Sequence, residues 1–147
     1  MKTTYEVADK ETARYVTDVA YEIHPSLAEH GVTLAVLFAG PELKHRGFPA
    51  AATVRITRVA DRLAGMPDAV ITIDRARWDG LDDAGRRALV DHEAAHLVVD
   101  VRDGEVQYDE AGRPRLKMRR HDCEIGFFFD VIERHGKDAC ESKQYLE

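Results

Sequence analysis

Cysteine is scarce in this chain, and that scarcity limits the kinds of site it can build. Only Cys123 and Cys140 are present, and they form no C-x-x-C pair. A zinc knuckle made from four thiolates is therefore impossible, and we expect no disulfide in a reducing compartment. Most ligands of any metal site must come from other residue types.

Long apolar runs are also missing. No stretch is apolar for long enough to span a bilayer. Residues 1–6 lack the apolar segment of a secretory signal, so we expect a cytoplasmic protein and no membrane partner.

Positive charge is in deficit, with 21 Lys and Arg against 27 Asp and Glu and a formal net charge of −6. This balance argues against a general nucleic-acid binder but leaves room for a local basic patch. The 147 residues are 44% hydrophobic and 33% charged, which is typical of one soluble globular domain. We expect that domain to cover residues 1–147, with a core over about residues 11–136 and a polar tail over residues 137–147.

Residues 92–96 read H-E-x-x-H. On a helix, His92 and His96 lie one turn apart on the same face, so both imidazoles can bind one zinc ion. Glu93 can then act as the general base that takes a proton from a water molecule. This arrangement is typical of zinc-dependent hydrolases.

The residues around this motif predict that it is helical. Asp82 and Asp83 supply an acidic N-terminus, and apolar residues then recur near helical spacing as far as Val98. We expect one helix over about residues 83–100. It should run through the interior, where a pair of histidines and a glutamate without a metal would be costly to bury.

A catalytic zinc site needs a third protein ligand and keeps its fourth position for water. The chain has neither an H-x-x-G-x-x-H continuation nor an obvious E-x-x-x-D helix. His121 is the first candidate, because it stands at the start of a later helix that must pack against the motif helix. Glu124 is the main alternative, as a ligand or as a hydrogen-bond partner of a ligand imidazole, and Asp91 is a second such partner. Asp122 and Cys123 are the remaining ligand candidates.

The rest of the pattern predicts an α+β fold. We expect a helix over residues 11–29 that Pro25 ends or kinks, with solvated histidines, His24 and His30, near its end. Strands are expected over residues 32–39, 51–57 and 69–74, with Trp78 packed in the connection to the motif helix.

Residues 42–49 read as a loop and residues 106–119 as a hairpin. A last helix should begin near Asp122 and end at Gly136, with an apolar stripe made of Ile125, Phe128, Phe129 and Ile132.

Residues 113–120 carry an alternating pattern. Arg113, Arg115, Lys117 and Arg119 share one strand face, while Pro114, Leu116 and Met118 share the other. A solvated strand face explains this pattern. A basic strip beside the cleft, which guides an acidic peptide or a phosphate backbone, also explains it.

These features together resemble the phage metallopeptidases, small zincin-like proteins of phages and prophages that are related in outline to SprT-like metalloproteases. The resemblance rests on residues 68–73, on Trp78 and Leu81, and above all on residues 87–96, and it covers about residues 32–136. It implies a minimal zincin-like fold in which a histidine opening a later helix, here His121, completes the metal site. Ala94-Ala95 is a departure, because such families often carry a bulkier residue at the first of these positions and a cysteine or another small residue at the second. This alters packing and not ligation. The family's substrates are largely unassigned, so the resemblance implies a reaction class only.

We therefore predict a zinc-dependent metallopeptidase that hydrolyses a peptide or protein substrate, with Zn²⁺ on His92, His96 and His121 and with Glu93 as general base. The sheet edge beside the metal is expected to bind the substrate as an added strand. Arg119, Arg120 and Tyr108 are open candidates for stabilising the oxyanion.

Two alternatives stay open. One is a non-catalytic module whose structural zinc is closed by Cys123 or Glu124. The other is a nucleic-acid-associated protein that uses the basic strand of residues 113–120. The sequence specifies no oligomeric state.

Overall fold

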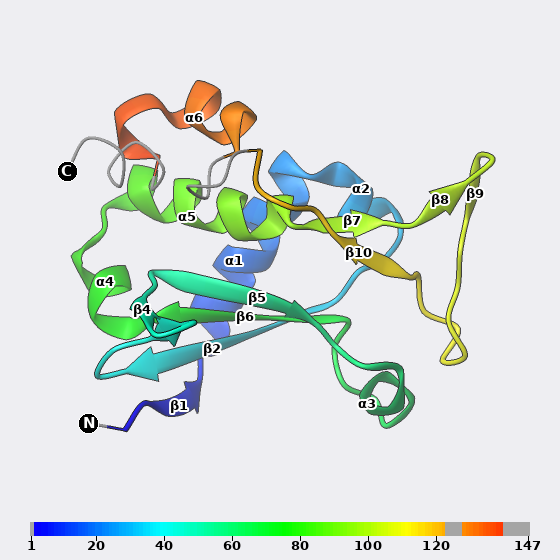
Figure 1. Ribbon diagram of the computed structural model, residues 1–147, viewed down its shortest axis with the longest axis horizontal. Coiled ribbons are helices and arrows are strands. Elements are labelled where there is room, and N and C mark those ends of the chain that lie inside the picture. Colours follow the sequence, from blue (N-terminus) through cyan, green and yellow to red (C-terminus); the bar gives the residue numbers. More distant parts are fainter. Residues whose placement is uncertain (1, 123–127, 140–147) are drawn as a thin grey trace.

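The computed structural model of this protein describes residues 2–122 and 128–139. Its main sheet forms one layer, and helices α1 (Lys10–Ile23) and α5 (Asp83–Ala95) lie together on one side of it (Figure 1). A third level, helix α6 (Phe129–His135), packs on α5 on the side away from the sheet. The predicted α+β class is confirmed.

The sheet has four strands in the order β1-β2-β6-β5. They are β1 (Thr4–Val7), β2 (Leu34–Gly40), β5 (Ala52–Ile56) and β6 (Ala69–Asp74). β2 and β6 run parallel in the centre, while β1 and β5 pair antiparallel on the two outer sides. All residues of β6 are buried, as its almost continuous run of apolar and β-branched residues predicts for a central strand. The three strands expected from the sequence are confirmed.

The predicted first helix is divided at Pro25. α1 ends at Ile23, and Pro25 occupies the first position of α2 (Pro25–Glu29), where its missing N–H costs nothing. Two further short helices follow strands, namely α3 (Val59–Leu63) after β5 and α4 (Arg75–Gly80) after β6. Trp78 of α4 is buried in the core, as expected, with its ring 6.4 Å from that of Phe38.

The core lies between the sheet and the pair α1 and α5. Val16 and Val19 of α1, Phe38 of β2, Ile71 of β6 and Val90 of α5 are all buried in this one cluster. Because α5 packs against both the sheet and α1, the motif that it carries is held in a rigid interior element. None of the helices in residues 2–122 and 128–139 has the length and apolar character that crossing a membrane requires.

Helix α5 ends earlier than the sequence predicts. It stops at Ala95, His96 is its C-cap, and Leu97–Val99 form strand β7. Strand β10 (Leu116–Met118) pairs antiparallel with β7, and the Arg119 N–H donates to the His96 carbonyl at 2.7 Å. A tertiary pairing thus replaces the last helical turn, and the expected helix end near residue 100 is wrong.

The region after β7 also differs from expectation. The predicted hairpin is present near its turn, where Tyr108 bridges Pro114, the Asp109 N–H donates to the Arg113 carbonyl, and the Arg115 N–H donates to the Gln107 carbonyl. Beyond it, β10 continues on to pair with β7. A hairpin of β8 (Val101–Arg102) and β9 (Glu105–Val106) precedes it. Its two turn residues, Asp103 and Gly104, both have positive φ, which suits the primed turn of a two-residue hairpin. The loop expected over residues 42–49 contains another short pair, β3 (Lys44–His45) and β4 (Phe48–Pro49).

Helix α6 begins at Phe129, later than predicted, and a single 3-10 turn, η1 (Gly136–Asp138), follows it. Asp122 does act near its start, because its carboxylate accepts a hydrogen bond from the Phe129 N–H at 2.8 Å. Phe128 is buried, whereas Phe129 is 61% exposed, so the expected apolar stripe is wrong at Phe129. Ile125 lies outside the described residues.

Candidate metal centre

Local sequence explains where α5 begins. The Asp82 carboxylate accepts a hydrogen bond from the Gly85 N–H at 2.8 Å and so caps the helix. A side chain at Gly85 would meet Leu81 Cδ2 at 3.0 Å, so the close approach of the preceding loop favours glycine there. From this start, the helix carries His92 and Glu93 in its last turn and delivers His96 at its C-cap.

Three histidines converge at the end of α5. His92, His96 and His121 each offer a ring nitrogen, and these nitrogens all lie within 4.8 Å of one another. The Nε2 atoms of His92 and His121 are 3.1 Å apart. Among the residues that the structure describes, this is the group of metal-ligating side chains that could hold an ion.

The spacing of the histidines suits a small metal ion. Two nitrogen ligands at about 2.0–2.1 Å from a tetrahedral zinc ion lie roughly 3.3 Å apart. The 3.1 Å between the Nε2 atoms of His92 and His121 is close to that value. Three neutral imidazoles are also a donor set that zinc accepts in open sites, so the residues present fit the ion.

His96 is held in one orientation and one protonation state. Its Nδ1 lies 2.7 Å from the carbonyl oxygen of Arg119, and since a carbonyl only accepts, Nδ1 carries the proton and Nε2 keeps its lone pair. Burial lowers the pKa of His96 to about 4. The side chain is therefore a neutral imidazole at neutral pH, which is the form that binds a metal.

Phe128 forms the apolar support of the three histidines. Its ring centroid lies 4.9 Å from that of His92, 4.8 Å from that of His96 and 5.1 Å from that of His121. The Arg119 guanidinium covers the ring at 4.4 Å from its centroid and pairs with Asp130 at 3.2 Å. This packing limits the rotamers of all three histidines, so little ordering is left for a metal to impose.

Glu93 lies on α5 between the two histidines and is only 5% exposed. A glutamate at this depth, one residue from His92, has the position that the motif assigns to a general base.

Asp91 does not have the role that the sequence suggested. Its carboxylate accepts hydrogen bonds from His24 at 2.7 Å, from Arg134 at 2.6 and 2.9 Å, and from His135 at 2.9 Å. None of these partners belongs to the histidine group, so Asp91 joins α5 to α6 and to the end of α1. His24 is mostly buried in this contact, so its expected solvation is wrong.

The other ligand candidates stand apart or cannot be placed. Asp122 is engaged with the Phe129 N–H and with Arg119 and is not part of the histidine group. Glu124 and Cys123 lie outside the described residues. Of the oxyanion candidates, Arg119 is paired with Asp122 and Asp130, Tyr108 is exposed in the bridge to Pro114, and Arg120 is exposed beside His121.

The charges of residues 113–120 are mostly paired. Arg113 contacts Asp68 at 2.7 Å, Arg115 contacts Glu110 at 3.5 Å, and Lys117 contacts Asp100 at 3.1 Å. With Arg119 on Asp130, every basic side chain of the alternating pattern has an acidic partner. This favours a solvated strand face over a free strip for a phosphate backbone.

Two elements of the site were not expected from the sequence. The Arg119 carbonyl is a backbone group, so no residue type could indicate that it orients His96. Phe128 was expected in the core, and its apolar neighbours correctly predict burial, but only the fold brings it to the histidines.

The chain matches one known family. The model of the family described as "Putative phage metallopeptidase" matches residues 4–147, almost the whole chain. No curated protein and no solved structure matches the chain significantly.

Proposed function

This chain belongs to the phage metallopeptidase family, and we propose that it is a zinc-dependent peptidase with His92, His96 and His121 as metal ligands. One observation carries the proposal: two histidines of an H-E-x-x-H helix meet a third from a distant segment, with ring nitrogens within 4.8 Å of one another. Three protein ligands leave a position open for water, as in catalytic zinc sites.

The chain's own residues supply the rest of the chemistry. When bound, zinc acts as a Lewis acid that makes a water molecule more acidic and polarises a carbonyl group. Glu93 accepts the proton of the attacking water and returns it to the leaving amine. The hydrogen bond from His96 to the Arg119 carbonyl keeps its metal-facing nitrogen deprotonated. Phe128 keeps one side of the histidines apolar and strengthens the electrostatic interactions there.

Strand β5 is the proposed binding edge for the substrate main chain. It is the last strand of the sheet and packs near α5 and β10. The hydrogen bonds from Asp74 to Ala51 and from Thr57 to Asp68 fix the ladder so that the odd-numbered residues face β6. The N–H and C=O groups of Ala52, Val54 and Ile56 therefore point outward, where an extended peptide can add a strand.

The first experiment measures zinc content by elemental analysis of wild type, His121→Ala and a control, His45→Ala, all purified without added metal. His45 is exposed on β3 and is not one of the three converging histidines. We expect about one zinc per chain in wild type and in the control, and clearly less than one in His121→Ala, because two protein ligands hold zinc far more weakly than three. Zinc retained by His121→Ala would give the third ligand role to Glu124 or Cys123, and a wild type without zinc would end the peptidase proposal.

The second experiment tests Glu93. Glu93→Gln keeps the size of the side chain and removes its basicity, so zinc content should stay at the wild-type value. Hydrolysis of an unfolded protein such as denatured casein should fall by at least about 10²-fold. An active Glu93→Gln protein would remove Glu93 from the role of general base. A cobalt-substituted spectrum typical of four protein ligands would favour a structural site instead.

A further inference from the structure

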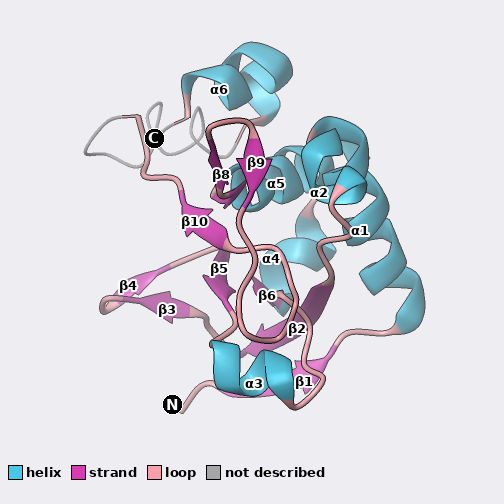
Figure 2. Cartoon of the chain, turned by 90° about the vertical axis from the view of Figure 1, so that its right-hand side faces the viewer, coloured by secondary structure: helices cyan, strands magenta, loops and turns pink. Residues whose placement is uncertain are grey.

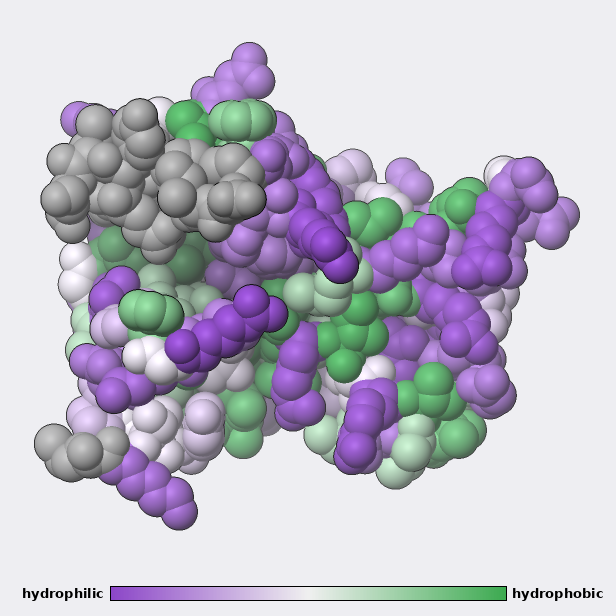
Figure 3. Space-filling model, in the orientation of Figure 1, coloured by the Kyte–Doolittle hydropathy of each residue, from purple (hydrophilic) through white to green (hydrophobic). Residues whose placement is uncertain are grey.

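A cleft lies at the end of β5 that includes Ile56. It has a volume of about 580 Å³ and is bordered by the end of β5 with α3, by the chain after β7, and by the start of β10. In Figure 3 this part of the surface, right of centre, shows apolar side chains bordered by long hydrophilic ones. The apolar part of its lining comes from Ile56, Val59 and Leu116.

The charged lining of this cleft is mainly basic. Four arginines face two aspartates, although the whole chain carries a net charge of −6. The arginines are Arg58, Arg62, Arg102 and Arg115, and the aspartates are Asp100 and Asp109. Asp61 and Glu110, which do not line the cleft, pair with Arg58 and Arg115, so the cleft can attract an anion only through arginines whose ion pairs are weak.

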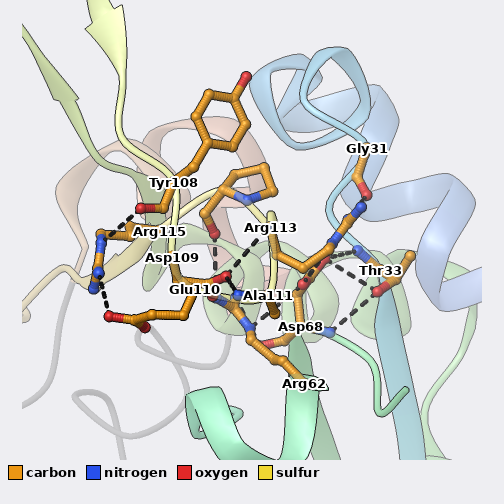
Figure 4. Close-up of polar contacts among 11 residues, drawn as sticks. Gly31, Thr33, Arg62, Asp68, Tyr108, Asp109, Glu110, Ala111, Arg113 and Arg115 are labelled. Carbon is orange, nitrogen blue, oxygen red and sulfur yellow. Dashed lines mark hydrogen bonds and ion pairs between the residues drawn. The ribbon is translucent and has the colours of Figure 1, made fainter. Parts of the chain in front are cut away.

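The floor of the cleft is rigid. The Arg62 side chain is only 3% exposed, donates to Asp109 at 2.6 Å and lies 3.4 Å from Asp68. Asp68 also binds Arg113 and Thr33, so this network ties the segment between β9 and β10 to the start of β6 (Figure 4). Figure 2 shows this segment crossing in front of β5 and β6. Because these charges are buried and paired, Arg62 shapes the cleft and is not available to a ligand.

The rim arginines are different. The side chains of Arg58, Arg102 and Arg115 are 82%, 68% and 44% exposed, and their ion pairs measure 3.3, 3.4 and 3.5 Å. Asp61 and Glu110, the partners of Arg58 and Arg115, are also exposed, at 42% and 70%, and exposed ion pairs of this kind contribute about 0–1 kcal/mol. Arg102 instead pairs with Asp100, which is only 5% exposed. The guanidinium groups of Arg58 and Arg115 can therefore turn toward an incoming carboxylate at little cost, and each can bind it through two N–H groups.

Unsatisfied polar atoms also gather here. Thr57 Oγ1, Arg62 Nε and Asp100 Oδ1 are buried without a hydrogen-bond partner among the described residues, and all three residues line this cleft. Arg62 Nε and Asp100 Oδ1 each keep an ion-pair contact, whereas the Thr57 hydroxyl has none. Buried hydroxyls are normally hydrogen-bonded, so this one indicates that a polar ligand or water belongs in the cleft.

The cleft is connected to the metal centre by two strands. Asp100 follows His96 by four residues through β7, which corresponds to about 13 Å of extended chain. Ile56, the last residue of the proposed binding edge, lines the cleft directly. An extended peptide also spans about 13 Å in four residues. If its scissile bond lies at the histidines and it runs along β5 toward Ile56, the side chain about four residues from that bond lies over the cleft.

We propose that this cleft is a specificity subsite that binds an acidic side chain of the peptide substrate, about four residues from the bond that is cleaved. The inference rests on the proposed peptidase function. An acidic peptide fits better than a nucleic acid, because the cleft adjoins a strand edge that binds main chain. Arg113 and Lys117 pair with the buried carboxylates of Asp68 and Asp100, so these two cations do not extend the rim into a track for successive phosphates.

The first test measures binding without catalysis. Blocked tetraglutamate and tetraglutamine peptides are titrated into metal-loaded wild type, the double variant Arg58→Gln/Arg115→Gln, and Arg14→Gln as control, because Arg14 is exposed on α1 outside the cleft. We expect tetraglutamate alone to bind, with amide shifts at Thr57 and Asp100, and to weaken as salt rises. The double variant should bind about five- to twenty-fold more weakly, and Arg14→Gln should match wild type.

Three results would overturn the subsite: equal affinity in wild type and the double variant, equal binding of tetraglutamine, or tighter binding of an oligothymidylate with the same number of charges. Unchanged melting temperatures would show that the variants are folded.

The second test uses the zinc-loaded protein on a library of peptides from digested cell protein. Wild type should prefer Asp or Glu about four positions from the cleaved bond, and the double variant should lose that preference while it still cleaves. If wild type cleaves nothing, the proposed function fails, and the binding experiment still decides whether the cleft takes acidic peptides. If wild type cleaves without acidic preference, the subsite fails and the peptidase stands.

Discussion

Replacing Asp91 with alanine should destabilise the protein more than almost any other single polar substitution. The Asp91 side chain is fully buried, and its two oxygens accept four hydrogen bonds from His24, Arg134 and His135 at 2.6–2.9 Å. These donors come from the end of α1 and from α6, so one carboxylate holds three helices together. In the contacts described here, Asp91 is the one carboxylate that His24, Arg134 and His135 all contact, and Asp91→Ala removes it.

The magnitude follows from the number and exposure of the donors. A hydrogen bond to a charged group contributes about 1.5–3 kcal/mol, which for four bonds is an upper limit of roughly 6–12 kcal/mol. The loss of stability is smaller than this limit, because the side chains of Arg134 and His24 are 36% and 20% exposed and can form hydrogen bonds with water when Asp91 is absent. We therefore expect a loss of about 3–5 kcal/mol in the free energy of unfolding, the usual cost of breaking a buried ion pair.

The assay is urea unfolding of wild type, Asp91→Ala and Asp18→Ala, followed by circular dichroism. Asp18 is an exposed aspartate of α1 and serves as the matched control. The expected loss corresponds to a fall of about 6–20 °C in melting temperature for a chain of this size. If Asp91→Ala and Asp18→Ala unfold within about 1 kcal/mol of each other, the carboxylate does not stabilise the helix junction and our account of it is wrong.

Three further predictions concern the network around Asp68 and the β8–β9 hairpin. Arg62→Met should lower the free energy of unfolding by about 3–5 kcal/mol, because it leaves the buried Asp109 carboxylate without its cation; a change below about 1 kcal/mol in urea unfolding would contradict this. Burial alone would raise the pKa of Asp68, but hydrogen bonds from Arg113 and Thr33 hold it below its ordinary value of 3.8. The contribution of ionised Asp68 to the free energy of unfolding is therefore fully present above about pH 4 and is lost as the pH falls further. Arg113→Gln should flatten that acid loss in unfolding curves measured from pH 5 to pH 2, and curves that stay parallel would refute the coupling. Gly104→Ala places alanine at φ +79°, with nothing within 4 Å of the new Cβ, so backbone strain alone should loosen the hairpin by about 1–2 kcal/mol. Faster amide hydrogen exchange over residues 101–106 would report this loosening, and unchanged exchange would count against it.

Local patterns predicted the elements whose stabilising contacts are close in sequence. The Asp82 cap correctly indicated where α5 starts, and the run of apolar residues 69–73 correctly indicated a buried strand. Pro25 correctly marked the break between α1 and α2. The Asp103-Gly104 pair is a comparable local signal for the β8–β9 turn, which was not predicted.

Predictions failed where a distant segment competes with a local preference. Residues 97–99 continue a helical pattern, but pairing with β10 is the stronger interaction and ends α5 at Ala95. His24 looked like a solvated helix end, yet its partner Asp91 lies 67 residues away. Phe129 has helical spacing to Ile132, yet it is 61% exposed, because Phe128 and Val131 are the residues that pack against Ala95.

The sequence by itself determined which side chains are available for the proposed chemistry, because residue types and helical spacing alone place His92 and Glu93 on α5 and His96 at its C-cap. The tertiary structure decided whether that chemistry has a site. His121 reaches His92 across 29 residues, and the Arg119 carbonyl orients His96 across 23, through the pairing of β7 with β10. The basic cleft beside β5 likewise exists only because α3, the chain after β7, and β10 meet there. Such contacts depend on which distant segments pack together, and no local periodicity encodes them.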